Sequence, residues 1–258
     1  LKPPPPKRKL TLGTVFREIF ETIGNRSFFA LFLAALLGAV ATGLSAALAF
    51  YFTTYFWNFT PQQTGWVTVS VFASAIIGSV MAPIVTRTIG KKRGAMIIGI
   101  IAFVGSPMPI MLRLAGVLPG NEHPLIFPFV VTTVMIDTGL IICFQILSSS
   151  MLADLVEQAE LKTGRRSEGL FFSAVTFIRM CVQGLGVMTA SFVLAAAKFP
   201  TGAAQGQVPE DSLWRLGAYY APTILAIWMG MMAVMATYKL SRTDHEENLR
   251  KLAEARKG

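Results

Sequence analysis

Charged and amide side chains stand inside long apolar stretches of the chain, where a charge is costly. Asp137 lies in the fourth of these stretches and Arg179 in the fifth. In hydrocarbon, an ionisable side chain faces a water-filled cavity or a partner of opposite charge, and it commonly marks a solute or ion pathway. Gln145 and Gln183 lie in the same two stretches and carry amides that line an aqueous path or form hydrogen bonds between helices. These four residues are our candidates for a solute or ion pathway.

Asp137 and Arg179 come to similar depths if both stretches are helices that cross a bilayer. Asp137 lies about 13 residues into its span, or about 20 Å at 1.5 Å per residue. Arg179 lies about 9 residues into a span that enters from the opposite side, or about 14 Å. In an apolar core about 30 Å thick, this spacing predicts an ion pair near the midplane. The alternative is that carbonyls, hydroxyls or water satisfy each charge separately.

A second set of charges fills the segment between these two stretches. Its members are Asp154, Glu157, Glu160, Arg165, Arg166 and Glu168. The first three recur every three residues, so they share one side of a helix. Carboxylates and guanidiniums this close form a charge-assisted network that reorganises when a gate opens. Composition alone favours the alternative, an ordinary solvated loop that follows the positive-inside rule.

The sequence contains no constellation typical of catalysis or metal binding. His123 and His245 lie far apart and outside the apolar stretches, and Cys143 and Cys181 each stand alone in an apolar run. Neither a phosphate-binding loop nor a nucleophile motif is present. We therefore expect no enzyme, no metal site and no cofactor.

The elements that position these residues are predicted from composition. Hydrophobic residues make up 53% of the chain and charged residues 14%, against about 25% charged in an ordinary soluble domain. That balance excludes a soluble enzyme or nucleic-acid-binding domain of the usual type. Crossing a bilayer takes a helix of about 20 mainly apolar residues. The stretches that qualify are 28–57, 66–86, 95–118, 124–152, 170–197 and 213–240.

Basic residues are concentrated on alternate connections between the predicted spans. Nineteen of the 23 Lys and Arg residues fall on one side and two on the other. The positive-inside rule then places both termini in the cytoplasm, so the net charge of +9 is a topology signal and not a sign of nucleic-acid binding. We expect residues 1–26 to be a cytoplasmic linker with an amphipathic helix, 27–240 to be the six-helix bundle, and 241–258 to be a charged cytoplasmic tail.

The segment that joins the fourth and fifth spans carries a recognisable pattern, ADLVEQAELKTGRRSEGLFF at 153–172. It resembles the glycoside–pentoside–hexuronide:cation symporter family of the major facilitator superfamily, typified by the melibiose permease. The loop at 78–93 is similar to a degenerate copy of that superfamily's basic loop, without its usual acidic residue. The resemblance covers nearly the whole chain and corresponds to the family's C-terminal half.

The resemblance implies an all-α membrane protein, with six transmembrane helices that form the C-terminal bundle of a twelve-helix fold. It implies symport of a sugar with Na⁺ or H⁺ by alternating access, in the plasma membrane (the bacterial inner membrane). Membrane lipids, a small-molecule solute and the N-terminal six-helix half are the implied partners, and the coupling cation binds in that other half. By the same resemblance, the cytoplasmic gate and the contacts between the two halves include Asp154, Glu157, Glu160, Arg165, Arg166 and Glu168. The family's lysine in the eleventh helix aligns with Met180, one residue after Arg179.

Other functions remain open from the sequence. The chain is also compatible with a major facilitator carrier of a non-sugar solute or a lysolipid, or with a membrane scaffold or receptor of the same fold that does not transport. Because the chain begins at Leu1, we expect an upstream segment, although a dimer of half-sized subunits is possible in principle.

Overall fold

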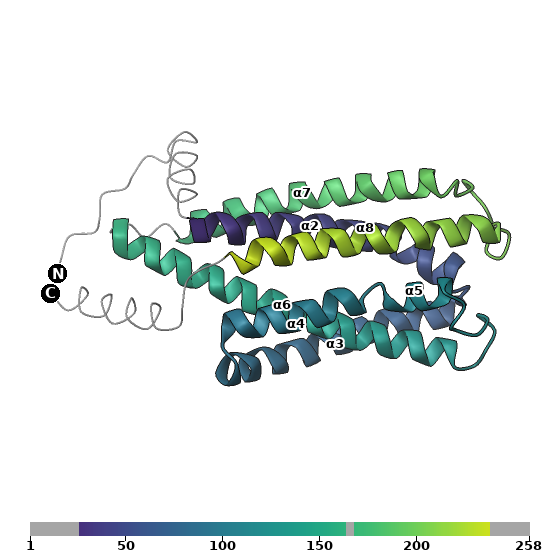
Figure 1. The fold of residues 1–258 in the computed structure, drawn as a ribbon, viewed down its shortest axis with the longest axis horizontal. Helices are drawn as coiled ribbons and strands as arrows, with labels where there is room; N and C mark the ends of the chain where they lie inside the picture. The colour runs from purple at the N-terminus through teal and green to yellow at the C-terminus, as the bar shows by residue number, and fades with distance from the viewer. Residues whose placement is uncertain (1–25, 164–167, 238–258) are drawn as a thin grey trace.

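The computed structural model describes residues 26–163 and 168–237, and this part of the chain is built from helices alone (Figure 1). The helices are α2 (Arg26–Tyr51), the π-helix η1 (Phe52–Phe56), α3 (Pro61–Thr88), α4 (Lys91–Gly105), α5 (Met108–Leu114), α6 (Ile126–Thr163), α7 (Glu168–Ala196) and α8 (Glu210–Ala236). The predicted amphipathic helix within 1–26 and the tail 241–258 lie outside the described residues, and the domain boundaries stay a prediction.

Six of the described segments are long and apolar enough to cross a membrane. They are Phe29–Phe56, Pro61–Thr88, Lys91–Leu114, Ile126–Asp154, Thr176–Ala196 and Glu210–Ala236. Each overlaps one of the predicted spans, so the all-α, six-span fold is confirmed. The third span is divided into α4 and α5 at Ser106–Pro107, where the proline lacks the N–H that would continue the helix.

Local sequence determines where α3 begins. The backbone N–H of Thr60 donates to Gln63 Oε1 at 2.9 Å, and the backbone N–H of Gln63 donates to Thr60 Oγ1 at 3.3 Å. This capping box satisfies two donors that the first turn leaves free, and Pro61 occupies the first helical position, where no N–H is needed. The connection 57–60 between the first two spans is therefore short and well defined.

The helices pack in two layers. One layer holds α2, α7 and α8, and the other holds α3, α4 and α6 (Figure 1). Within the layers, α2 packs on α7 and α8, while α6 packs on α3 and α4; α4 and α5 contact α8 between the layers. Although α6 and α7 are consecutive in the chain, they are not packed along each other. This arrangement decides which polar residues can meet.

Glycines allow α2 and α7 to approach at backbone distance. A Cβ atom on Gly43 would overlap the backbone oxygen of Gln183, and one on Gly186 would overlap the backbone oxygen of Val40. Small residues at a helix crossing let backbones meet in this way in membranes. The contact fixes the position of α7, and with it the side chains of Gln183 and Arg179.

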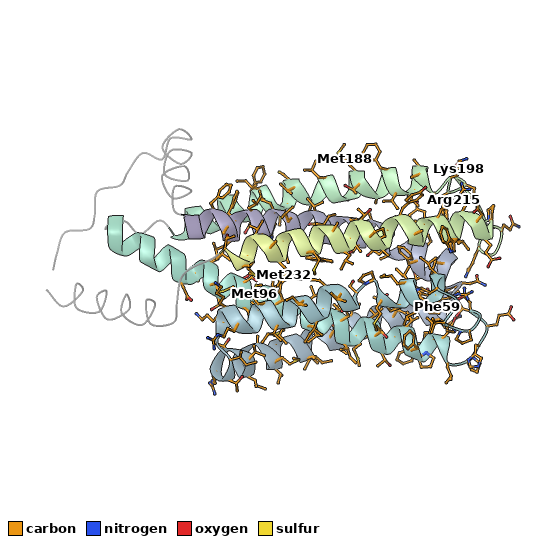
Figure 2. The ribbon with its side chains drawn as sticks, viewed as in Figure 1. Phe59, Met96, Met188, Lys198, Arg215 and Met232 are labelled. Carbon is orange, nitrogen blue, oxygen red and sulfur yellow. The ribbon has the colours of Figure 1, made fainter. Side chains whose placement is uncertain are left out.

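Apolar side chains fill the bundle and also cover its surface. Figure 2 shows Met96 and Met232 between the layers and Met188 on the outer side of α7. Buried between the layers, the rings of Phe103 and Trp228 stack with centroids 4.0 Å apart. Phe72 on α3 is 74% exposed, as expected of a side chain that faces lipid or another apolar surface.

Candidate functional site

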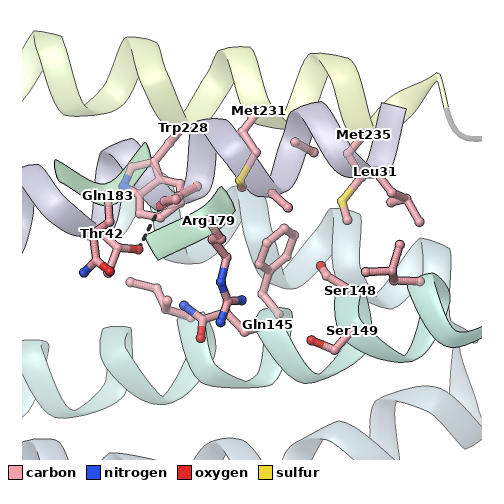
Figure 3. A pocket seen from close by; sticks show the side chains of 17 residues that line it. Leu31, Thr42, Gln145, Ser148, Ser149, Arg179, Gln183, Trp228, Met231 and Met235 are labelled. Carbon is pink, nitrogen blue, oxygen red and sulfur yellow. Dashed lines mark hydrogen bonds between the residues drawn. The ribbon is translucent and has the colours of Figure 1, made fainter. Parts of the chain in front are cut away.

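A cavity of about 210 Å³ lies between the two layers, bounded by α2, α6, α7 and α8 (Figure 3). Helices α2 and α8 contribute a mainly apolar wall that includes Leu31, Met231 and Met235. Most of the polar side chains come from α6 and α7. The polar and charged residues, apart from Trp228, are Thr42, Gln145, Ser148, Ser149, Arg179 and Gln183. We call this cavity the interlayer pocket.

Three of the four pathway candidates lie together in the interlayer pocket. Figure 3 shows Arg179 reaching from α7 toward Gln145 on α6, with Gln183 one turn further along α7. Arg179 is the single ionisable residue among the seventeen that line the pocket, and its side chain is exposed. Within the described ranges, it forms no ion pair with a carboxylate. Among the described residues, therefore, no carboxylate balances the positive charge at the pocket.

Asp137, the fourth candidate, lies outside this pocket. Its carboxylate accepts a hydrogen bond from the Ser106 hydroxyl, at the break between α4 and α5. A Cβ on the neighbouring Gly105 would lie 3.0 Å from Asp137 Oδ1, so the carboxylate rests against the backbone there. The fold itself thus satisfies part of the hydrogen-bonding capacity of Asp137.

The predicted ion pair between Asp137 and Arg179 is wrong. The ion pairs among the described residues are Lys91–Asp154 and Asp211–Arg215. Gln145, toward which Arg179 reaches, follows Asp137 by about eight residues, or about 12 Å along α6. The depth estimate failed because it assumed that consecutive spans pack together, whereas α6 packs on α3 and α4, and α7 packs on α2.

Two buried polar atoms of the interlayer pocket lack hydrogen-bond partners among the described residues. They are the indole Nε1 of Trp228 and the hydroxyl Oγ of Ser148. Trp228 is 4% exposed, and its stacking on Phe103 holds the ring in place. A buried polar group without a partner costs about 1–3 kcal/mol, so each such group calls for an explanation. Both atoms are closed to solvent in this structure, so a molecule in the pocket would reach them only after a local rearrangement.

Sequence patterns did not indicate a role for Trp228. A tryptophan in an apolar stretch is typical of a core position. The sequence of that stretch does not show which helix packs against the tryptophan. The one available signal was chemical, since a buried indole N–H normally has an acceptor. Finding it here required the packing of α8 against α2 and α4, which places Trp228 at the pocket.

The predicted gate residue Asp154 takes part in an ion pair within this bundle. Lys91 Nζ lies 2.7 Å from both carboxylate oxygens of Asp154, which joins the first residue of α4 to α6. Asp154 is 9% exposed, so the pair is largely shielded from solvent. Lys91 came from the basic loop of the sequence and had not been assigned to the gate.

The remaining gate candidates are described in part or not at all. Glu157 and Glu160 belong to the backbone of α6, and Glu168 is the first residue of α7. The structure does not describe the side chains of these three residues. Arg165 and Arg166 lie outside the described residues. The gate assignment therefore stays a prediction. In the described ranges, no group of three or more His, Cys, Asp and Glu side chains is arranged to hold a metal ion.

Comparison with known proteins gives one family match and several distant relatives. Residues 2–242 match a family described as MFS/sugar transport protein. The chain is 23% identical to an uncharacterized symporter of Synechocystis, over 90% of this chain and 42% of that protein. It is 28% identical to a glucuronide carrier protein homolog of Escherichia coli, over 72% of this chain and 38% of that protein.

The name of a further relative contains a different solute. The chain is 26% identical to a putative 2,3-dihydroxypropane-1-sulfonate exporter of Salmonella typhimurium, over 93% of this chain and 49% of that protein. The chain thus spans about half the length, or less, of the curated relatives it matches.

Proposed function

The chain belongs to the family of MFS/sugar transport proteins, and from this premise we propose that it is the C-terminal half of a secondary active transporter. The family match extends over residues 2–242, and the six membrane-length helices fit one half of a major facilitator fold. The expected resemblance to a symporter family is thereby confirmed. Transport, and not catalysis, is the function that the family name assigns.

The proposed activity is symport of a sugar or a related polyhydroxylated solute, coupled to Na⁺ or H⁺. The observation that carries this proposal is the interlayer pocket, which places amides and hydroxyls inside a membrane-spanning bundle. Gln145 and Gln183 each offer both donors and an acceptor to solute hydroxyls. Two relatives are named for hydroxylated solutes: a glucuronide carrier homolog and a putative dihydroxypropanesulfonate exporter. Their names support a hydroxylated solute for this chain as well.

In the proposed mechanism, this bundle forms one wall of a central cavity and rocks against a second six-helix half. Rocking opens the solute site to each side of the membrane in turn. The coupling cation binds carboxylates of that second half, because Arg179 would repel a cation in the interlayer pocket. The Lys91–Asp154 ion pair stabilises one end of this bundle while the other gate residues of 153–172 exchange partners.

The proposed location is the bacterial inner membrane, with both termini in the cytoplasm. The chain is a multi-pass membrane protein by its spans and its family. Its orientation rests on the distribution of basic residues. Labelling of single cysteines introduced at Thr201 and at Lys92, in intact cells with an impermeant maleimide, tests it. We expect label at position 201 alone; label at position 92 alone would invert the topology.

The direct test of transport is uptake by the intact protein reconstituted in liposomes. Labelled neutral and acidic sugars and small hydroxylated acids are supplied with an inward Na⁺ gradient, an inward H⁺ gradient, or neither. We expect accumulation above the external concentration with one of the gradients, and none once an ionophore has collapsed that gradient. Protein-free liposomes are the control.

Absence of flux for every solute under every gradient would contradict the proposal. Specific binding of a soluble protein without any flux would instead favour a scaffold or receptor role. Accumulation of a non-sugar solute alone would retain transport and replace the sugar assignment.

A further inference from the structure

We propose that the hairpin between α3 and α4 binds the headgroup of an anionic phospholipid, held by the exposed guanidiniums of Arg87 and Arg93. The acyl chains of this lipid lie along exposed apolar faces of the same two helices. The surface lies outside the interlayer pocket, so the inference does not depend on which solute is transported, or on transport itself.

The connection between α3 and α4 is short and fixes where these arginines lie. Ile89 and Gly90 alone join the two helices, at one end of the bundle (Figure 1). Gly90 has a φ of 88°, a conformation that glycine adopts without strain. Arg87 is in the last turn of α3 and Arg93 in the first turn of α4. Both arginines are therefore held at the same end of two membrane-length segments.

The hairpin carries two further basic residues, and both bond to other helices of the bundle. Lys91 pairs with Asp154 on α6. Lys92 Nζ donates to the backbone oxygen of Ala236, the last residue of α8, at 3.5 Å. These bonds anchor the hairpin to both helix layers, so the arginines beside them project from a fixed platform.

Arg87 and Arg93 are exposed and have no anionic partner in the described part of the chain. The ion pairs among the described residues include neither of them. No Asp or Glu occurs between Glu21 and Glu122, so α3 and α4 contain no acidic residue. The planar donors of a guanidinium match the oxygens of a phosphate group. The charge of this surface thus complements a phospholipid headgroup with a net negative charge.

Each arginine also shares a helix face with exposed apolar side chains. Residues three, four or seven positions apart lie on one face of a helix. The exposed apolar residues at these spacings from the two arginines are Val80, Ile84, Ile97 and Ile100. Each face is therefore basic at the hairpin and apolar along the span. A phospholipid has the same order, with a charged headgroup at the interface and acyl chains in the hydrocarbon.

Two rival partners for these arginines belong to the protein itself. One is a carboxylate of the second transporter half, and the other is an acidic residue of the tail 241–258, such as Glu246. Either partner would neutralise the arginines in any bilayer. Both rivals therefore predict equal contact with anionic and zwitterionic lipids at the hairpin, whereas the lipid site predicts a preference.

The experiment measures lipid selectivity beside the hairpin of the intact protein in nanodiscs. A bimane fluorophore is attached through Ile97→Cys, in a background without other reactive cysteines. The nanodiscs mix phosphatidylcholine with either brominated phosphatidylglycerol or brominated phosphatidylcholine. Bromine on the acyl chains quenches the fluorophore on contact, so the two quenching curves give the preference for anionic lipid. Val69→Cys is the control position, because it is exposed and far along α3 from Arg87.

We expect phosphatidylglycerol to be preferred about 25-fold at position 97, since each basic residue beside an anionic surface contributes about a factor of 5. Position 69 should show no such preference. Arg87→Gln combined with Arg93→Gln should abolish the preference at position 97, and each single change should lower it about 5-fold. The corresponding double change to lysine should retain most of it. Higher salt should reduce it through screening.

Lys198→Gln is the matched control variant, because Lys198 is an exposed basic residue at the opposite end of the bundle (Figure 2). It should leave the preference at position 97 unchanged. Equal quenching by the two lipids at position 97, with both arginines present, would overturn the inference. A preference that survives the double change to glutamine, or that is equally strong at position 69, would overturn it as well.

If the double glutamine variant does not fold, the single variants and the salt dependence decide the question. No solute is present in this experiment, so its failure leaves the proposed transport function standing. Conversely, failure of uptake in liposomes would leave the lipid site standing.

Discussion

Asp137 and Arg179 are both charged residues within membrane-spanning helices, but their surroundings differ. Asp137 accepts a hydrogen bond from Ser106 and rests against the backbone at Gly105, so its carboxylate already has contacts within this bundle. Arg179 is exposed at a pocket that contains no other ionisable residue and two unpartnered polar atoms. A charged residue in an apolar stretch can therefore belong to either of two classes. Asp137 is bonded within the bundle, whereas Arg179 is left available to a ligand.

The largest effect should come from the glycine contact that positions α7. Gly186→Leu should destabilise the intact protein by about 3 kcal/mol or more, because the side chain would enter the backbone of α2 at Val40. Gly184→Leu is the matched control, since a Cβ there meets nothing within 4 Å. Thermal unfolding in detergent, followed by tryptophan fluorescence, measures both. Equal midpoints for the two variants would mean that α2 and α7 do not pack as described.

The next effect concerns the ion pair that closes one end of the bundle. Lys91→Met should cost about 2 kcal/mol, because it removes the cation 2.7 Å from both oxygens of the largely buried Asp154. Lys91→Arg keeps the charge and should recover most of this loss. Chemical unfolding of the intact protein measures the three stabilities, which should decrease from the unaltered protein to Lys91→Arg to Lys91→Met. Full stability of Lys91→Met would show that this pair, unlike Asp137, is not a structural element.

The comparison itself is tested by removing each charge in turn. Asp137→Ala should cost about 1–3 kcal/mol because Ser106 loses its acceptor, and Asp137→Asn should cost less because an amide oxygen still accepts. Arg179→Gln should change stability by less than about 0.5 kcal/mol, since no described carboxylate depends on it. The readouts are the unfolding midpoint and the uptake rate. If Asp137→Asn loses uptake but keeps full stability, Asp137 is a pathway residue. The contrast between a structural Asp137 and a ligand-facing Arg179 would then be wrong.

The smallest effects compare two buried aromatic residues with polar tips. Tyr220→Phe should cost about 1 kcal/mol, because its hydroxyl and that of Ser45 share a hydrogen bond of 3.1 Å. Trp228→Phe should lose less stability than Tyr220→Phe, because Nε1 has no hydrogen-bond partner among the described residues. The smaller ring can still stack on Phe103. A solute-induced rise in the unfolding midpoint should persist in Tyr220→Phe and shrink in Trp228→Phe. The opposite pattern would count against the pocket as the solute site.

Sequence reasoning predicted the spans because membrane crossing imposes a length and a composition on each helix separately. The family resemblance at 153–172 was confirmed over nearly the whole chain by the match to residues 2–242. Gln145, Gln183 and Arg179 were named as pathway candidates from the sequence, and the structure places all three at one pocket, while their role stays a prediction.

Sequence reasoning failed where the result depends on which helices pack together. The apolar pattern of each span does not reveal that α6 packs on α3 and α4 and that α7 packs on α2. For that reason, the Asp137–Arg179 ion pair was predicted although it does not form, and the Lys91–Asp154 pair was missed. Trp228 became a candidate only when its ring was found buried at the pocket without an acceptor for its N–H.

The central claim is that solute occupies the interlayer pocket, and solute protection of an introduced cysteine tests it most directly. Ser149→Cys places a thiol at an exposed position of the pocket, and Thr201→Cys places one in the connection between α7 and α8 as a control. Both are made in the intact protein, in a background without other reactive cysteines. The account predicts that a transported solute at saturation slows maleimide labelling at position 149 and leaves position 201 unchanged. Equal labelling rates at position 149 with and without that solute would contradict it.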